Sequence, residues 1–247
     1  MDVMGKMMKI LFLGNSHTYF NDMPQIFKEI CQGYGIDVDV TMLAFPGVTY
    51  GWHLKERYHL RFALMYGNYQ YIIMQQASHS PCPSMEETLR DGMEIIELAR
   101  KNGVTPIQTI PWAEKRFPQN QEKINKIYQE LHRKTGVTLN PVGHIFEKLK
   151  EELPEISLYW KDGEHASYYG SYVNALTTFS TLFDEDIMLA PTKAHNLYPL
   201  AEDAGEICPG GPIMDRKATE IMVEDRYANA IKKCVEQYCS KKIESAC

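Results

Sequence analysis

The chain has 247 residues, of which 44% are hydrophobic and 23% charged, and its formal net charge is −6 at pH 7. This length can bury one sizeable core, and no linker or repeat divides the sequence, so we expect a single domain over residues 1–247. Acidic and basic residues are interspersed, which argues against a nucleic-acid partner. No apolar run approaches the roughly 18 residues of a membrane span, so we expect no membrane partner either.

The amino terminus and the cysteines carry no signal of export or metal binding. The first ten residues, MDVMGKMMKI, lack the basic, apolar and small-residue regions of a secretory signal, so the chain as given predicts a cytoplasmic location. The six cysteines form no CxxC pair and no Cys/His spacing typical of zinc. We therefore expect neither a metal nor a cofactor, and the sequence leaves the oligomeric state open.

Short apolar runs alternate with segments of helical spacing along most of the chain. Strands are expected near 8–14, 38–44, 70–75, 104–110 and 137–142. Helices are expected at about 23–34, 51–66, 84–102, 118–135, 142–152, 167–183 and 215–240. This alternation predicts an α/β protein, a three-layer α/β/α sandwich around a central, mostly parallel five-stranded sheet of flavodoxin-like type. Residues 184–247 are expected to form a loop, over 184–214, and a carboxyl-terminal helix extension.

Residues 9–24, KILFLGNSHTYFNDMP, contain the first candidate for chemistry. An aliphatic run ends at Gly14-Asn15-Ser16 and is followed by helix-forming sequence. A side chain at such a turn lies at the carboxyl edge of a parallel sheet, where open α/β folds bind ligands. Ser16 is therefore a candidate nucleophile, and the alternative is an ordinary helix N-cap.

A second segment, Tyr159 to Tyr172, places an acid and a histidine three residues apart before a helical pattern. In nucleophilic acyl transfer a serine needs an imidazole base, and the imidazole needs a carboxylate that fixes its tautomer. Asp162 and His165 fit these two roles. The alternative is that Asp162 caps a helix and His165 is a surface residue of its first turn.

These residues resemble the SGNH or GDSL-like hydrolases. In that family a first block reads Gly-Asp/Asn-Ser after a strand, and a last block reads Asp-x-x-His. Gly14-Asn15-Ser16 and Asp162-Gly163-Glu164-His165 match the two blocks in order. The resemblance is to the branch with a GNS-type first block and a glutamine-containing third block, and it covers roughly residues 8 to 183. It implies the SGNH hydrolase fold and a serine esterase with Ser16, His165 and Asp162 as its triad.

The resemblance also implies an oxyanion hole with three donors. Ser16 and Gly47 match the two backbone N–H donors, although Gly47 in Pro46-Gly47 is also typical of a turn. The usual asparagine of the third block is absent, since Gln75-Gln76 follows the third predicted strand. A glutamine amide can also donate to an oxyanion. Neighbouring residues of a strand point to opposite faces, so only one can serve, and we favour Gln75 with Gln76 as its rival.

Four further residues are candidate substrate contacts, namely His17, Ser78, His79 and Trp112. A solvated loop position is the alternative for Ser78 and His79, and core packing is the alternative for Trp112. The expected substrate is a small carboxylic ester, with an acetylated carbohydrate as the class that the resemblance implies. The competing hypothesis is a catalytically weak protein of the same fold that binds a carbohydrate or a peptide, because the asparagine block is missing.

Overall fold

The computed structural model describes residues 7–55, 58–78, 83–196 and 219–244. A five-stranded sheet of order β2-β1-β3-β4-β5 lies at its centre, and every pairing within it is parallel. The strands are β1 (Met8–Gly14), β2 (Val38–Ala44), β3 (Tyr71–Met74), β4 (Thr105–Thr109) and β5 (Thr138–Asn140). The expected α/β fold and its five strands are confirmed, and the sheet is wholly parallel where we expected a mostly parallel one.

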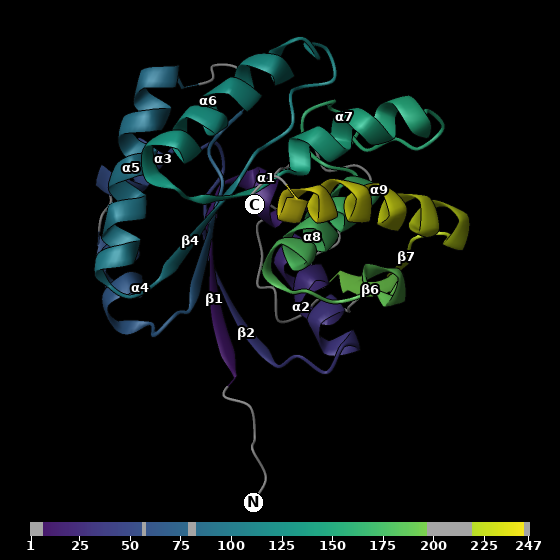
Figure 1. Ribbon diagram of the computed structural model, residues 1–247, viewed down its shortest axis with the longest axis horizontal. Helices are drawn as coiled ribbons and strands as arrows, with labels where there is room; N and C mark the ends of the chain where they lie inside the picture. The colour runs from purple at the N-terminus through teal and green to yellow at the C-terminus, as the bar shows by residue number, and fades with distance from the viewer. Residues whose placement is uncertain (1–6, 56–57, 79–82, 197–218, 245–247) are drawn as a thin grey trace, which may run out of the picture.

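Helices cover both faces of this sheet (Figure 1). One face is covered by α3 (Tyr50–Lys55), α4 (Tyr58–Tyr66), α5 (Met85–Lys101) and α6 (Asn120–Thr135). The other is covered by α2 (Met23–Gly33), α7 (Val142–Glu152), α8 (Tyr168–Leu182) and α9 (Asp225–Glu244). Strand alternation explains the two cores: Leu11 and Leu13 pack on the first face, whereas Ile10 and Phe12 pack on the second.

Local signals set several helix ends. Ser84 and Glu87 form a capping box at the start of α5, with backbone-to-side-chain hydrogen bonds of 2.9 and 3.1 Å. Gly136 ends α6 with a left-handed φ of 65°. Pro24 lies in the first turn of α2, where its missing N–H costs no hydrogen bond. These ends agree with the sequence-based expectation to within about two residues.

Three expectations about the chain after residue 50 were wrong. The helix expected over 51–66 is two helices, α3 and α4, with residues 56–57 outside the described part. In the loop expected over 184–214, η2 (Ile187–Leu189) and β6 (Lys193–Asn196) form, while 197–218 lies outside the described residues. The start of the helix expected over 215–240 is instead β7 (Thr219–Met222).

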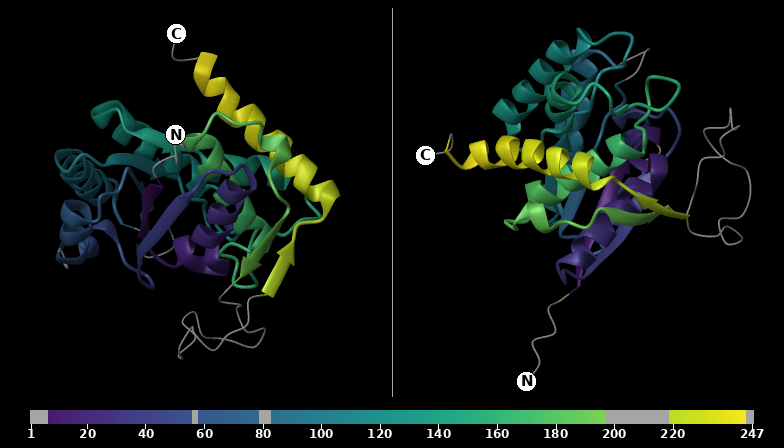
Figure 2. Two further views of the ribbon diagram at one scale, coloured as in Figure 1. Left: turned by 90° about the horizontal axis from the view of Figure 1, so that it is seen from below. Right: turned by 90° about the vertical axis from the view of Figure 1, so that its right-hand side faces the viewer.

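The strands β6 and β7 explain part of this error. They pair with each other antiparallel, in register Lys193↔Met222, and β6 packs against α2 while β7 leads into α9 (Figure 2). A strand whose partner lies this far along the chain leaves a weak local signal, because the pairing is tertiary.

That residues 1–247 form a single domain stays a prediction.

Candidate active site

Ser16 begins the short helix α1 (Ser16–Tyr19) directly beyond β1. Asn15 is the N-cap of this helix, since its side chain accepts a hydrogen bond of 3.0 Å from the N–H of His17. The Asn15 amide donates to the carbonyl of Val48 at 3.2 Å, which ties the loop after β2 to the serine turn. At Gly14 a Cβ atom would overlap the Thr18 hydroxyl, so any larger residue would force Thr18 to move. The alternative in which Ser16 is the N-cap is wrong, because Asn15 has that role.

The segment from Tyr159 to Ala166 is a tight loop that carries an acid and an imidazole. Its ends meet in an antiparallel bridge between Tyr159 and Ala166, and the N–H of Trp160 donates to the carbonyl of His165 at 2.8 Å. Asp162 Oδ1 accepts the N–H groups of Glu164 and His165 at 2.8 and 3.0 Å. The backbone of the loop therefore holds the Asp162 carboxylate and the residue His165 in place.

The three predicted catalytic side chains form one chain of hydrogen bonds. His165 Nε2 lies 2.7 Å from Ser16 Oγ, and His165 Nδ1 lies 2.7 Å from Asp162 Oδ2. A proton on Nδ1 donated to the carboxylate leaves Nε2 as the acceptor for the serine hydroxyl. The imidazole is buried, whereas the Asp162 side chain is 34% exposed. His165 is thus no surface residue, and this arrangement is chemically suited to removing a proton from Ser16.

The electrostatics of Asp162 favour its charged form. Burial opposes ionisation, but hydrogen bonds from the N–H of Glu164 and from the His165 ring outweigh it, so the pKa of Asp162 lies below its ordinary value. The carboxylate therefore stays negative throughout the neutral range. A fixed negative charge beside Nδ1 stabilises the imidazolium that would form when Nε2 accepts a proton.

Gly47 lies at the exposed turn after β2, with a left-handed φ of 65°. No described atom lies within 4 Å of the position that a Cβ would take. The left-handed backbone explains why a glycine occupies this turn. The space that a side chain would fill is open, so a ligand has room to approach the Gly47 backbone.

Gln75 and Gln76 follow β3 and point to opposite faces, as strand alternation requires. Gln75 Oε1 accepts the Thr18 hydroxyl at 3.1 Å, on the side of α1. Gln76 Oε1 accepts the N–H groups of Tyr50 and Ala77 at 2.9 and 3.0 Å, on the side of α3. Both amide nitrogens, Nε2, are buried without a hydrogen-bond partner among the described residues. Either glutamine therefore retains a donor, and the choice between them stays open.

Three of the four predicted substrate contacts lie together, and His17 among them adjoins the imidazole of His165. The His17 ring lies 5.2 Å from the ring of Trp112 and 5.1 Å from that of His165. Ser78 Oγ lies 3.3 Å from His17 Nδ1 and donates to the carbonyl of Trp112 at 3.1 Å. His79 lies outside the described residues.

Trp112 is part of the hydrophobic core and does not line an open site. Its side chain is 1% exposed and stacks on Phe146 at 4.5 Å. Its indole N–H donates to the carbonyl of Glu164 at 2.8 Å, and the N–H of Lys115 donates to the carbonyl of Gly163 at the same distance. The segment after β4 therefore supports the loop that carries His165.

Sequence reasoning missed His53, which lies under the serine turn. Its Nε2 is 2.8 Å from the carbonyl oxygen of Gly14, and burial lowers the pKa of the ring although this hydrogen bond opposes the shift. No local pattern distinguishes a histidine in α3 that supports β1 from one on a helix surface. Only the tertiary contact identifies it.

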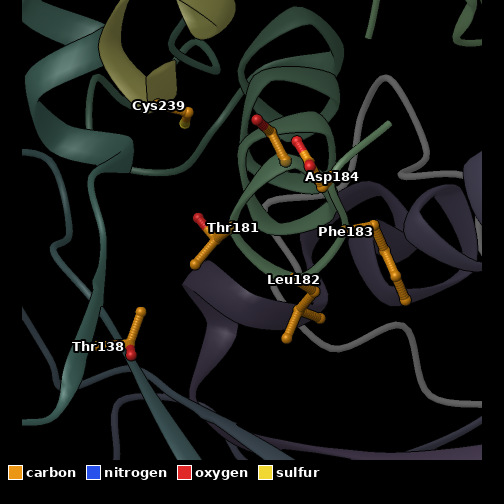
Figure 3. A pocket seen from close by; sticks show the side chains of 7 residues that line it. Thr138, Thr181, Leu182, Phe183, Asp184 and Cys239 are labelled. Atoms are coloured by element: carbon orange, nitrogen blue, oxygen red, sulfur yellow. The ribbon is translucent and has the colours of Figure 1, made fainter. Parts of the chain in front are cut away.

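A pocket of about 370 Å³ lies elsewhere, between the start of β5 and the end of α8 (Figure 3). Its lining residues are Thr138, Ser180, Thr181, Leu182, Phe183, Asp184 and Cys239. Thr138 is the first residue of its strand, so this pocket opens at the edge of the sheet opposite Ser16. In the described part of the chain no group of three or more His, Cys, Asp or Glu residues is arranged to hold a metal ion. None of the helices described is long and apolar enough to cross a membrane.

Comparisons with known proteins found matches among solved structures and none by sequence. No protein-family model matches the chain, and no curated protein matches it by sequence. A protein from Slackia heliotrinireducens described as an SGNH hydrolase is 24% identical, with a TM-score of 0.64 over 72% of this chain and 100% of its own. A DUF4886 family protein from Bacteroides uniformis is 16% identical, with a TM-score of 0.68 over 94% of each chain.

The acetyl xylan esterase AlAXEase is 15% identical, with a TM-score of 0.59 over 71% of this chain and 100% of its own. Further structural neighbours are described as a member of the lipolytic protein G-D-S-L family, a GDSL-like lipase and a lipase/acylhydrolase. At these identities the likeness concerns the arrangement of the chain in space. The chain therefore has the SGNH hydrolase-like fold, an α/β architecture whose five parallel strands run in the order 2-1-3-4-5.

Proposed function

We propose that the protein is a metal-independent serine esterase that hydrolyses a small carboxylic ester with Ser16, His165 and Asp162. The observation that carries the proposal is the unbroken pair of 2.7 Å contacts from Asp162 Oδ2 to His165 Nδ1 and from His165 Nε2 to Ser16 Oγ. These distances lie within the reach that nucleophile, base and orienting acid need. A serine without a catalytic role in the first turn of a helix has no need of a buried imidazole on its hydroxyl.

The reaction would proceed in two halves. Ser16 Oγ attacks the ester carbonyl carbon while His165 Nε2 takes the hydroxyl proton, which gives a tetrahedral intermediate. Nε2 then returns the proton to the departing alcohol oxygen as the carbonyl re-forms, and an acyl-serine remains. A water molecule attacks that acyl group, loses its proton to Nε2, and releases the acid as Ser16 recovers its proton. Asp162 orients the ring and stabilises the imidazolium in both halves.

The developing negative oxygen needs preorganised donors. We assign this role to the N–H groups of Ser16 and Gly47 and to a glutamine amide, with Gln75 favoured over Gln76. Support comes from the Asn15 to Val48 hydrogen bond, which holds the Gly47 loop beside the serine turn, and from the two buried amide nitrogens without partners. A donor that is already buried gains strength from the low local dielectric.

An acetylated carbohydrate is the substrate class that we propose. The support is the glutamine-containing third block and the likeness in fold to the acetyl xylan esterase. His17, Ser78 and His79 remain proposed contacts to the substrate, and the buried Trp112 would act mainly through His17, which its ring adjoins. Hydrolysis of acetyl esters of sugars, measured as acetate release, distinguishes this class from other esters.

The deciding experiment compares wild type with Ser16→Ala on an activated short-chain acetyl ester. We expect Ser16→Ala to lose at least about 10³-fold in kcat, because the nucleophile itself is removed. Ser180→Ala, on the opposite edge of the sheet, is the matched control and should keep wild-type activity. Thermal melts establish that both variants fold. Equal activity of Ser16→Ala and wild type would sink the proposed mechanism.

If no variant turns over any ester, a fluorophosphonate that reacts covalently with activated serines gives a second readout. Labelling of wild type but not of Ser16→Ala would keep the nucleophile and shift the question to the natural substrate. No labelling would favour the competing hypothesis, a binding protein of this fold.

A further inference from the structure

The last two residues of the short 3-10 helix η1 (Phe20–Asp22) have an unusual backbone. Asn21 and Asp22 have left-handed φ values of 55° and 52°. Residues other than glycine adopt this region at a cost, which asparagine and aspartate bear best. The pair lies between α1, which carries Ser16, and α2. Strain of this kind persists only where the surrounding structure determines it, and it is often found beside functional sites.

The side chain of Asn21 shows what the strained backbone positions. It is 7% exposed, and its Nδ2 donates to the carbonyl of Ala166 at 3.0 Å and to Ser171 Oγ at 2.9 Å. The Ser171 hydroxyl in turn donates to the carbonyl of Phe20 at 3.1 Å. These bonds fasten the segment that follows Ser16 to the segment that follows His165, 145 residues farther along the chain.

The neighbouring Phe20 contacts the imidazole itself. Its ring is stacked on the ring of His165, with centroids 4.1 Å apart and planes 19° apart. His17 meets the same imidazole edge to face at 5.1 Å. Because these rings and Asp162 surround the imidazole, its orientation depends on where the backbone of Phe20 and Asn21 lies.

We propose that Asn21 is a positioning residue that sets the approach of His165 Nε2 to Ser16 Oγ. Through its amide it fixes the backbone after His165, and through the Ser171 hydroxyl it fixes the carbonyl of Phe20, whose ring supports the imidazole. Glycine would supply the left-handed backbone without the amide. Aspartate would turn a negative oxygen toward the Ala166 carbonyl. The inference rests on the proposed function, since the reaction defines which approach is productive.

Two substitutions separate positioning from stability. Asn21→Ala removes the amide and keeps a strained Cβ, whereas Asn21→Gly removes the amide and relieves the backbone. The glycine variant should therefore melt at a higher temperature than the alanine variant. We expect both to lose about 10²-fold in kcat with little change in KM, because a misplaced base affects the chemical step. Asn68→Gly is the control: Asn68 has the same φ of 55°, is exposed, and lies in the turn before β3.

The control should keep wild-type kcat. If kcat in the two Asn21 variants instead follows their melting temperatures, or does not fall, Asn21 is a structural residue only and the inference is overturned. Fall of kcat in Asn68→Gly as well would overturn it too, because the loss would then belong to any left-handed asparagine.

A spectroscopic readout keeps this test independent of ester hydrolysis. The proton that His165 Nδ1 shares with Asp162 should give a low-field NMR signal, assigned by its absence in His165→Gln. We expect the signal to shift or broaden in both Asn21 variants and to persist in Asn68→Gly. An unchanged signal in Asn21→Gly would overturn the inference, whereas absence of ester turnover in wild type would count against the proposed function alone.

Discussion

Asn140 and Gln75 are both buried side-chain amides near the ends of parallel strands, and they differ in their hydrogen bonds. Asn140 Nδ2 donates to the hydroxyls of Thr109 and Thr178 at 3.2 and 2.9 Å, and its Oδ1 lies 3.2 Å from the hydroxyl of Thr181. At Gln75 the Oε1 has a partner, but the buried Nε2 has none among the described residues. The amide of Asn140 therefore has hydrogen-bond partners for both its nitrogen and its oxygen. The amide of Gln75 has a partner for its oxygen only.

The difference indicates what each region is built for. A buried donor without a partner costs about 1–3 kcal/mol, so a fold keeps few of them. Gln121, also buried, uses both ends of its amide, as it accepts from the N–H of Ala113 and donates to the carbonyl of Pro111. Among the buried side-chain amides of the described residues, Gln75 and Gln76 are the exceptions, and both lie at the edge that carries Ser16. An oxyanion hole is expected to contain preorganised donors whose partner is the negative oxygen that develops on the substrate.

The sharpest way to break this comparison is Gln75→Leu. We expect kcat to fall about 10²–10³-fold, the usual effect of losing one oxyanion donor. Stability should fall by only about 1 kcal/mol, because a single neutral hydrogen bond with Thr18 is lost. Ester hydrolysis and thermal melts measure the two effects. Unchanged kcat would show that the Gln75 amide does not act on the reaction.

Gln76→Leu is the matched variant for that experiment. Gln76 Oε1 accepts two backbone N–H groups, so its removal should destabilise the protein more than Gln75→Leu does. If Gln75 is the donor, kcat in Gln76→Leu should fall less. A larger fall in Gln76→Leu, with the protein still folded at the assay temperature, would move the assignment to Gln76.

Asn140→Ala tests the other side of the comparison. It removes hydrogen bonds that join β4, β5 and α8, so we expect a loss of about 1–3 kcal/mol in the free energy of unfolding. At temperatures where the variant is folded, kcat should stay within about twofold of wild type, because the side chain of Asn140 bonds to threonines and not to the proposed triad. Urea unfolding followed by circular dichroism measures the loss. A fall in kcat without a fall in stability would contradict the division between the two regions.

Local patterns were sufficient for the sheet and most of its helices, and the reason is physical. Apolar runs with period two or near 3.6 give each strand and helix its buried face, and Gly136 or the Ser84 capping box marks an end. Ser16, Gly47 and Gln75 could be placed near one edge because the carboxyl ends of parallel strands must meet there. The distances between them could not be predicted, since they depend on side-chain packing.

The supporting residues left no signal in the sequence. Phe20 and Asn21 read as ordinary residues between two helices until the imidazole of His165 and the carbonyl of Ala166 are found against them. The pairing of β6 with β7 was missed for the same reason, because each strand is defined by a partner elsewhere. Trp112 shows the opposite case, in which a candidate substrate contact is largely buried in the core, as the alternative for this residue predicted.

The smallest effect that we expect is the pH dependence of stability due to His53, whose ring contacts the Gly14 carbonyl. Burial lowers the pKa of His53 from its ordinary 6.5, so below that pH the unfolded chain binds a proton that the folded protein resists. Its contribution to stability is therefore complete above about pH 6.5 and declines as the pH falls toward the folded pKa. Between about pH 7.5 and 5.5, His53→Gln should lose less stability than wild type does, by about 1 kcal/mol or less.

Thermal or urea unfolding at several pH values measures this difference. Asn140→Ala is the control, because it removes no titrating group and should keep the wild-type slope of stability against pH. Equal slopes for wild type and His53→Gln would mean that the His53 ring gains its proton as readily when folded as when unfolded. Below about pH 6.5 the contact with the Gly14 carbonyl would then hold a charged imidazole under the serine turn, whereas a lowered pKa keeps the ring neutral there.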